Sequence, residues 1–164
     1  MESWEQLLRK QIRLSARVAV IGVGNVARSD DAAGALVARG LLRGLSPLPK
    51  KALVVDAGDV PENFTGVVRT FAPDLAVIVD SAAAGRPTGA VFLVDPAEVA
   101  DEDVSTHRMP LTRLSRYIRE TMGCRVSILG IEPFAFKEGE PVSPAVARAV
   151  RRVVSVLRSA LEEE

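Results

Sequence analysis

Residues 17–34, RVAVIGVGNVARSDDAAG, are the stretch that decides the fold. Residues 18–23 form a short apolar run rich in β-branched side chains, which is typical of a strand buried on both faces of a sheet. A glycine and an asparagine follow, and both tolerate the backbone angles of a sharp turn. Asp30 and Asp31 come next, just before a helix predicted to start near Ala32. The strand therefore delivers two carboxylates to the edge of the sheet where α/β proteins usually bind ligands.

Three interpretations of the two carboxylates compete. A dinucleotide-binding loop would need a third glycine soon after Gly22 and Gly24, but the next one is Gly34. Asp30 and Asp31 could instead only cap the helix and favour its dipole. In the third interpretation one carboxylate caps the helix while the other is a metal ligand or a catalytic group. The choice among them depends on the rest of the chain.

The composition narrows the class of protein. A chain of 164 residues predicts one domain, residues 1–164, with an amphipathic helix in residues 1–15 appended to it. The 21 basic and 21 acidic residues cancel, which argues against a nucleic-acid or membrane-surface partner. One cysteine, Cys124, allows no internal disulfide and fits a cytoplasmic protein. No apolar run is long enough for a signal peptide or a spanning helix, and we expect a monomer.

Strands and helices alternate along the chain, which predicts an α/β fold: a three-layer α/β/α sandwich around a five-stranded, mostly parallel, twisted sheet. No helical pattern separates the third expected strand from the fourth, so we expect the fourth to run antiparallel at an edge. The five expected strands are residues 18–23, 52–55, 75–79, 91–94 and 125–131.

The third expected strand ends at Asp80. We expect this strand to lie beside the first, as in flavodoxin-like sheets, so that the topological switch point falls between their carboxyl ends. The pair Asp30 and Asp31 follows one of these strands and Asp80 ends the other. The two acidic sites should therefore meet in one crevice.

His107 is the only histidine, and it precedes a helix predicted from residue 111. A lone loop histidine is usually a surface or capping residue. Together with two carboxylates, however, one imidazole makes a mixed ligand set for a borderline divalent metal such as nickel or zinc, with a position left open. Ser29 lacks a nucleophile-elbow motif, and Cys124 is expected at the opposite end of the sheet. A serine or cysteine protease triad is therefore disfavoured.

Several motifs together resemble those of the hydrogenase maturation endopeptidases, and most closely the branch that serves formate hydrogenlyase-type enzymes (hydrogenase 3). They occur in the family's order along nearly the whole chain after the N-terminal helix. The matching pieces are GVGN at 22–25 with Asp30, Asp31 and Gly34, DAG at 56–58 with PEN at 61–63, VIVD at 77–80, TH at 106–107 with MPL at 109–111, and LGIEP at 129–133. The chain departs from the pattern at Ser29, where many relatives have glycine.

The resemblance implies an endopeptidase, of aspartic or metal-dependent type, that removes the C-terminal extension of a [NiFe]-hydrogenase large-subunit precursor after nickel insertion. The family's metal-contacting positions map onto Asp31, Asp80 and His107, which are the implied catalytic and metal residues. The nickel would be supplied by the substrate, so no permanent metal is expected. The hydrolytic nucleophile stays open between Asp31 and a water molecule.

Two other functions remain compatible with the same residues. One is a non-catalytic, nickel-dependent checkpoint or chaperone for the same subunit, and the other is a metal-dependent amidase that acts on small substrates. Cleavage of a nickel-loaded precursor without turnover of small peptides would separate all three.

Overall fold

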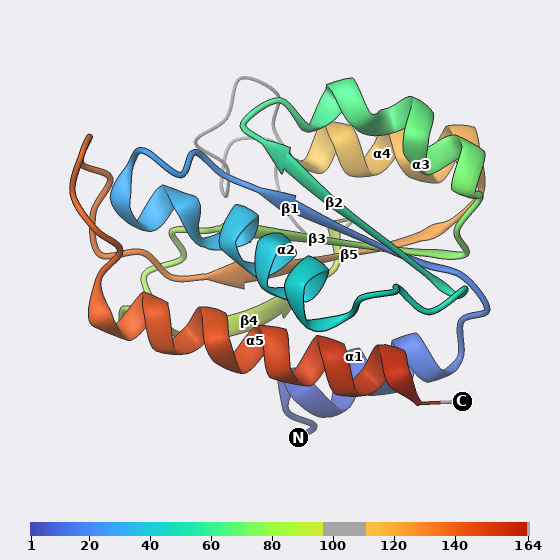
Figure 1. Cartoon of the computed structure of the whole chain (residues 1–164), viewed down its shortest axis with the longest axis horizontal. Coiled ribbons are helices and arrows are strands. Elements are labelled where there is room, and N and C mark those ends of the chain that lie inside the picture. Colours follow the sequence, from blue (N-terminus) through green and yellow to red (C-terminus); the bar gives the residue numbers. More distant parts are fainter. Residues whose placement is uncertain (97–110, 164) are drawn as a thin grey trace.

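The computed structural model of the chain describes residues 1–96 and 111–163, and these are organised around a five-stranded sheet of order β2-β1-β3-β5-β4 (Figure 1). The strands are β1 (Val18–Val23), β2 (Ala52–Gly58), β3 (Leu75–Ser81), β4 (Val91–Val94) and β5 (Arg125–Ile131). All neighbouring strands are parallel except β4, which pairs antiparallel with β5 at the edge. The predicted α/β class, the place of β3 beside β1 and the antiparallel edge strand are confirmed.

Helices cover both faces of the sheet and complete three layers (Figure 1). The α-helices of the described residues are α1 (Trp4–Arg13), α2 (Ala33–Gly44), α3 (Thr65–Phe71), α4 (Leu111–Met122) and α5 (Pro144–Glu162). Two 3₁₀ turns, η1 (Ser29–Ala32) and η2 (Pro61–Phe64), precede α2 and α3. Helices α1, α2 and α5 lie on one face, and α3 and α4 lie on the other. None of the described helices has the length and apolar character needed to cross a membrane.

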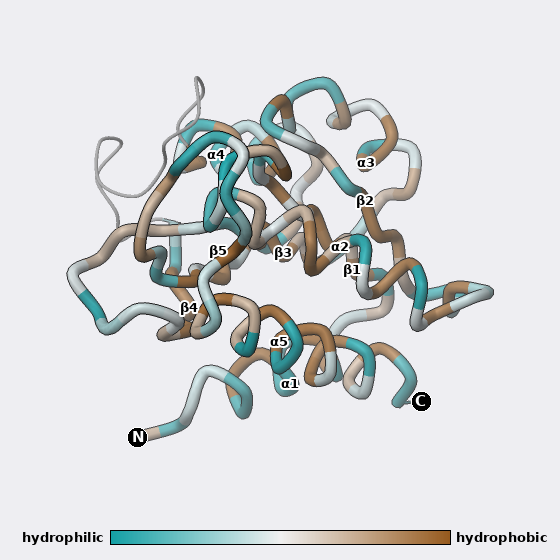
Figure 2. The backbone as a smooth tube through the Cα atoms, turned by 60° about the vertical axis from the view of Figure 1, so that its left-hand side comes forward, coloured by the Kyte–Doolittle hydropathy of each residue, from teal (hydrophilic) through white to brown (hydrophobic). Residues whose placement is uncertain are grey.

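Alternate side chains of each central strand enter two separate cores, as the pleat of a sheet requires. Val18 and Val20 of β1 pack toward α2 and α5, whereas Ala19 and Ile21 pack toward α3 and α4. Figure 2 shows this apolar character running along the central strands and the inner sides of the helices. β1 is buried along its whole length, which explains why its sequence is uniformly apolar rather than alternating.

The N-terminal helix α1 starts with a capping box. Gln6 donates its amide to the Ser3 hydroxyl at 3.2 Å, and the Gln6 side chain accepts from the Ser3 amide at 2.8 Å. Leu8 and Ile12 are fully buried in the core that α2 and α5 also form. Burying such a side chain stabilises the fold by about 1.5–3 kcal/mol, so the helix is held firmly against the sheet.

Helix α2 begins unusually close to the ends of two strands. A Cβ on Gly34 would lie 2.1 Å from the Val79 carbonyl oxygen of β3 and 2.2 Å from the Val23 carbonyl oxygen of β1. Only glycine allows such an approach. The start of α2 is therefore wedged at the switch point between β1 and β3, and the turn η1 directly before it is positioned there too.

Candidate functional site

Asp31 and Asp80 are brought to the same edge of the sheet. Asp31 lies in η1 after β1, Asp80 lies near the end of β3, and their exposed fractions are 2% and 0%. The hydroxyl of Ser81 donates to the backbone carbonyl of Asp30 at 2.5 Å, so the end of β3 directly contacts the acidic pair. The end of β3 and the turn η1 therefore lie against each other at the switch point between β1 and β3.

His107, the third residue of the predicted set, lies outside the described residues, as do Thr106, Met109 and Pro110. Within residues 1–96 and 111–163, no group of three or more His, Cys, Asp or Glu side chains is arranged to hold a metal ion. Of the predicted metal-contacting residues Asp31, Asp80 and His107, the structure therefore describes Asp31 and Asp80. Carboxylate oxygens of this kind suit a borderline divalent metal when a nitrogen or sulfur donor is added.

Asp30 has a different role from its neighbour. Its carboxylate is 1% exposed and accepts hydrogen bonds from the backbone amides of Phe134 (2.8 Å), Ala135 (3.3 Å) and Ser143 (2.7 Å), and from the Ser143 hydroxyl (3.0 Å). A buried carboxylate that accepts several amide hydrogen bonds is a strong structural tie. Asp30 therefore fastens the β5–α5 loop to the turn that follows β1.

The interpretation that Asp30 or Asp31 caps α2 is wrong. Helix α2 starts at Ala33, its N-cap is Ala32, and no side chain caps it. The η1 turn replaces a capped start because the Asp30 carboxylate is committed to a loop more than 100 residues away in sequence.

Ser29 adopts a left-handed backbone with φ 43°, a conformation that glycine adopts without strain. Its hydroxyl donates to the Ala135 carbonyl oxygen and accepts from the Lys137 amide, both at 2.8 Å. These bonds compensate for the strain of a non-glycine residue in this region. The serine thus strengthens the same tie that Asp30 makes.

Arg28 is a neighbour of the acidic site that sequence reasoning missed. One of its guanidinium nitrogens lies 3.8 Å from an Asp31 carboxylate oxygen, and another lies 3.3 Å from Glu138. The guanidinium also lies over the Phe136 ring, 5.9 Å from its centroid. Because Glu138 and Phe136 are far from Arg28 in sequence, no local pattern could have indicated these contacts.

Glu132 is a second residue whose role was not predicted. It is 6% exposed, and its carboxylate accepts from the Ala84 amide at 2.8 Å. Its own backbone bonds to Gly89 and Ala90 at 2.8 and 2.9 Å. Glu132 therefore holds the loop after β3 at the edge that carries Asp80. The one signal for it was its place in the LGIEP motif of the family resemblance.

Cys124 is not placed to act as a nucleophile. It directly precedes β5, at the amino end of the parallel strands and away from Asp80, as predicted. Its side chain is buried, and burial raises the pKa of its thiol above the ordinary value, with a further contribution from the negative charge of Asp74. The reactive thiolate is therefore disfavoured.

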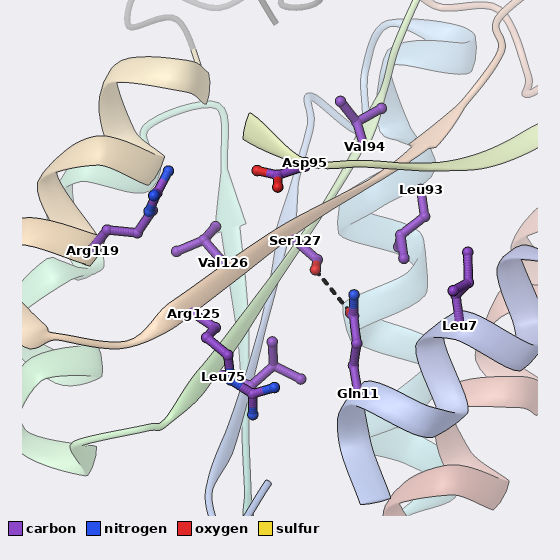
Figure 3. A pocket seen from close by; sticks show the side chains of 10 residues that line it. All are labelled: Leu7, Gln11, Leu75, Leu93, Val94, Asp95, Arg119, Arg125, Val126 and Ser127. Carbon is purple, nitrogen blue, oxygen red and sulfur yellow. Dashed lines mark hydrogen bonds between the residues drawn. The ribbon is translucent and has the colours of Figure 1, made fainter. Parts of the chain in front are cut away.

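A cavity of about 370 Å³ also lies at that far end, between α1, α4 and the start of β5 (Figure 3). Inside it, Ser127 donates its hydroxyl to the Gln11 side-chain oxygen at 2.8 Å, and the guanidinium of Arg125 bonds to Ser15 at 2.6 Å. Since Ser127 and Arg125 lie near the start of β5, this cavity is separate from the acidic edge. It contributes nothing to the candidate site.

The fold and the acidic edge define an α/β protein with two buried aspartates at the switch point of a mostly parallel sheet. Comparison with known proteins gives the family: the family model of hydrogenase maturation protease (HycI) matches residues 37–160. The chain belongs to the hydrogenase maturation protease family, and so to the hydrolases that act as endopeptidases. The resemblance stated from the motifs is confirmed.

Relatives agree with this assignment along most of the chain. The hydrogenase 3 maturation protease of Escherichia coli K12 is 33% identical over 137 residues, covering 80% of this chain and 85% of that protein. The crystal structure of the [NiFe] hydrogenase maturation protease HycI from Thermococcus kodakarensis KOD1 matches with a TM-score of 0.89 and 30% identity, covering 96% of this chain and 99% of the other. The solution structure of the endopeptidase HycI from Escherichia coli matches with a TM-score of 0.76 and 30% identity, covering 90% and 99%.

Proposed function

We propose that this protein is the endopeptidase that removes the C-terminal extension of a [NiFe]-hydrogenase large-subunit precursor once nickel has been inserted. The observation that carries the proposal is the shared position of Asp31 and Asp80, two buried aspartates at the carboxyl edge of the adjacent parallel strands β1 and β3. Family membership supplies the protease class and the hydrogenase context. We infer further that the chain acts as a cytoplasmic monomer, without nucleic acid or membrane.

In this proposal the nickel is part of the substrate. Asp31, Asp80 and His107 would contact a nickel ion that the precursor's own cysteines hold, because oxygen and imidazole donors can complete a thiolate-bound borderline metal. The chain's single cysteine is buried at the far end of the sheet, so the enzyme itself offers no cysteine thiolate at the acidic edge. The protein would therefore bind free divalent metal weakly and carry no resident ion.

Contact with the substrate-bound nickel would serve the reaction in either of two ways. It would hold the nearby peptide bond in register, which is a contribution of proximity. It would also polarise the scissile carbonyl or activate a water molecule. The attacking group is Asp31 or a water molecule, and both lie within this site in the proposal.

The direct test compares a protein substrate with small ones. The purified chain is incubated with nickel-loaded precursor and, separately, with short peptides that copy the sequence around the cleavage site, and products are followed by mass spectrometry. The proposal predicts shortening of the precursor and no turnover of the peptides. Tight binding of the precursor without cleavage would favour the checkpoint, and rapid peptide turnover would favour the small-substrate amidase.

A further inference from the structure

Phe134 is an exposed aromatic residue at the same edge of the molecule as the acidic site. Its side chain is 76% exposed, although it follows β5 directly in a fold whose other large apolar residues are mostly buried. We propose that Phe134 is the docking anchor for an apolar patch on the protein substrate beside the scissile bond. This proposal rests on the proposed function and names the part of the surface that recognises the substrate.

The main chain at Phe134 is fixed although its side chain is in water. Its amide donates to the buried Asp30 carboxylate at 2.8 Å, and the next amide, of Ala135, donates to the same oxygen at 3.3 Å. Two further bonds join Ser29 to Ala135 and Lys137. Because the backbone at Phe134 is already ordered, it loses little further conformational entropy when a partner covers the side chain, which makes binding more favourable.

The position of Phe134 suits a substrate that also reaches Asp31. The hydrogen bond to Asp30 places the Phe134 Cα within roughly 12 Å of the Asp31 Cα, given standard bond lengths. Three or four residues of extended peptide span about that distance. A protein segment bound at the acidic edge can therefore reach Phe134, whereas a metal ion or a very short peptide cannot span both sites.

The surroundings of Phe134 have the anatomy of a protein interface. A pocket of about 270 Å³ adjoins it, with Pro141 and Val142 in its wall. The charged residues Lys137 and Glu140 line the same pocket, and both are exposed. Interfaces typically combine an apolar anchor, a pocket and a polar rim of this kind.

The test measures steady-state cleavage of the nickel-loaded precursor by Phe134→Ala and by a matched control, Leu14→Ala. Leu14 is 67% exposed, but it lies between α1 and β1 at the opposite end of the sheet. We expect Phe134→Ala to raise KM by about 30-fold, the effect of losing a hot-spot anchor. We expect kcat to change little, because the residue touches no reacting atom. Leu14→Ala should match the wild type, and thermal unfolding should show both variants folded.

Three outcomes would overturn the proposal while leaving the protease function intact. An unchanged KM in Phe134→Ala would show that the residue does not contact the substrate. An equal rise in KM for Leu14→Ala would show a nonspecific effect of removing exposed apolar surface. A wild-type dimer that Phe134→Ala dissociates in size-exclusion chromatography would show that a second copy covers this residue. By contrast, a wild-type protein that cleaves no precursor would contradict the proposed function itself.

Discussion

The carboxylate of Asp30 accepts a 2.7 Å hydrogen bond from the backbone amide of Ser143, which lies 113 residues further along the chain. This bond closes the carboxyl edge of the sheet, because Asp30 follows β1 while Ser143 directly precedes α5. The neighbouring residue Asp31 is thereby held beside the end of β3. Asp30, which has no proposed chemical role, thus fixes the position of Asp31, which has one.

Removing the Asp30 carboxylate should be strongly destabilising. Asp30→Ala leaves the amides of Phe134 and Ser143 without their acceptor, and each unsatisfied buried donor costs about 1–3 kcal/mol. We expect the free energy of unfolding, measured with urea, to fall by about 3 kcal/mol or more. The control Glu138→Ala removes a carboxylate whose side chain is 75% exposed. It should lower the free energy of unfolding by less than about 1 kcal/mol. Equal stability of the two variants would contradict the structural role of Asp30.

Two substitutions at Ser29 should separate backbone strain from hydrogen bonding. Ser29→Ala keeps a non-glycine residue at φ 43° and loses both hydroxyl bonds, so we expect about 2 kcal/mol of destabilisation. Ser29→Gly loses the same bonds but relieves the left-handed strain of about 1 kcal/mol. The urea midpoint of unfolding should therefore be higher for Ser29→Gly than for Ser29→Ala. The reverse order would show that the strain has no energetic weight.

Acid should weaken the fold in part through Asp74. Burial alone would raise the pKa of this carboxyl, but the amides of Arg17 and Ala16, at 2.7 and 2.9 Å, outweigh it and lower the pKa below 3.8. The folded chain therefore holds the ionised form more strongly than the unfolded chain does. The stabilising contribution of Asp74 is complete above its ordinary pKa of 3.8. It is lost as the pH falls from there through the lowered pKa of the folded state.

The variant Asp74→Asn tests this contribution. We expect the wild type to be more stable by about 1 kcal/mol at neutral pH, since the site is only half-buried, and the difference to shrink below pH 3.8. Asp59→Asn is the matched control, because Asp59 is exposed. A difference that stays constant down to pH 2 would show that the pKa of Asp74 is not lowered.

The part of the site that follows from strand ends could be predicted from the sequence. Buried apolar runs place β1 and β3, and their parallel pairing brings Asp31 and Asp80 to one edge. The expectation for His107 rests on the family motif and lies outside the described residues. Strand-like apolar patterns and turn residues are local features of the sequence. They are therefore sufficient to predict the strands and the residues that directly follow each strand.

The ties between loops could not be predicted in this way. Asp30 precedes a helix and has the residue type of a cap, yet its partners are 104–113 residues away. The same is true of Arg28, whose neighbour Glu138 belongs to the β5–α5 loop. Such pairings depend on which loops the sheet order brings together, and no local pattern encodes them. Tertiary contacts here override the local preference for a cap.

Activity should depend on Asp31 and Asp80 and not on the thiol of Cys124. We expect Asp31→Asn and Asp80→Asn each to lower the rate of precursor processing by about 100-fold or more, as does loss of a positioned acid–base group. His107→Ala should have a similar effect. Cys124→Ala, in a buried position at the far end of the sheet, should process the precursor at close to the wild-type rate. Circular dichroism checks that each variant is folded. Wild-type processing by Asp80→Asn would exclude this site.

The most direct test of the account is the dependence of cleavage on nickel in the substrate. Nickel-loaded and nickel-free precursors are incubated with the chain under identical conditions, and the mass of the large subunit is followed over time. We expect only the loaded form to lose its C-terminal extension, because in the proposed function Asp31, Asp80 and His107 contact the substrate-bound metal. Equal cleavage of the two forms would contradict it.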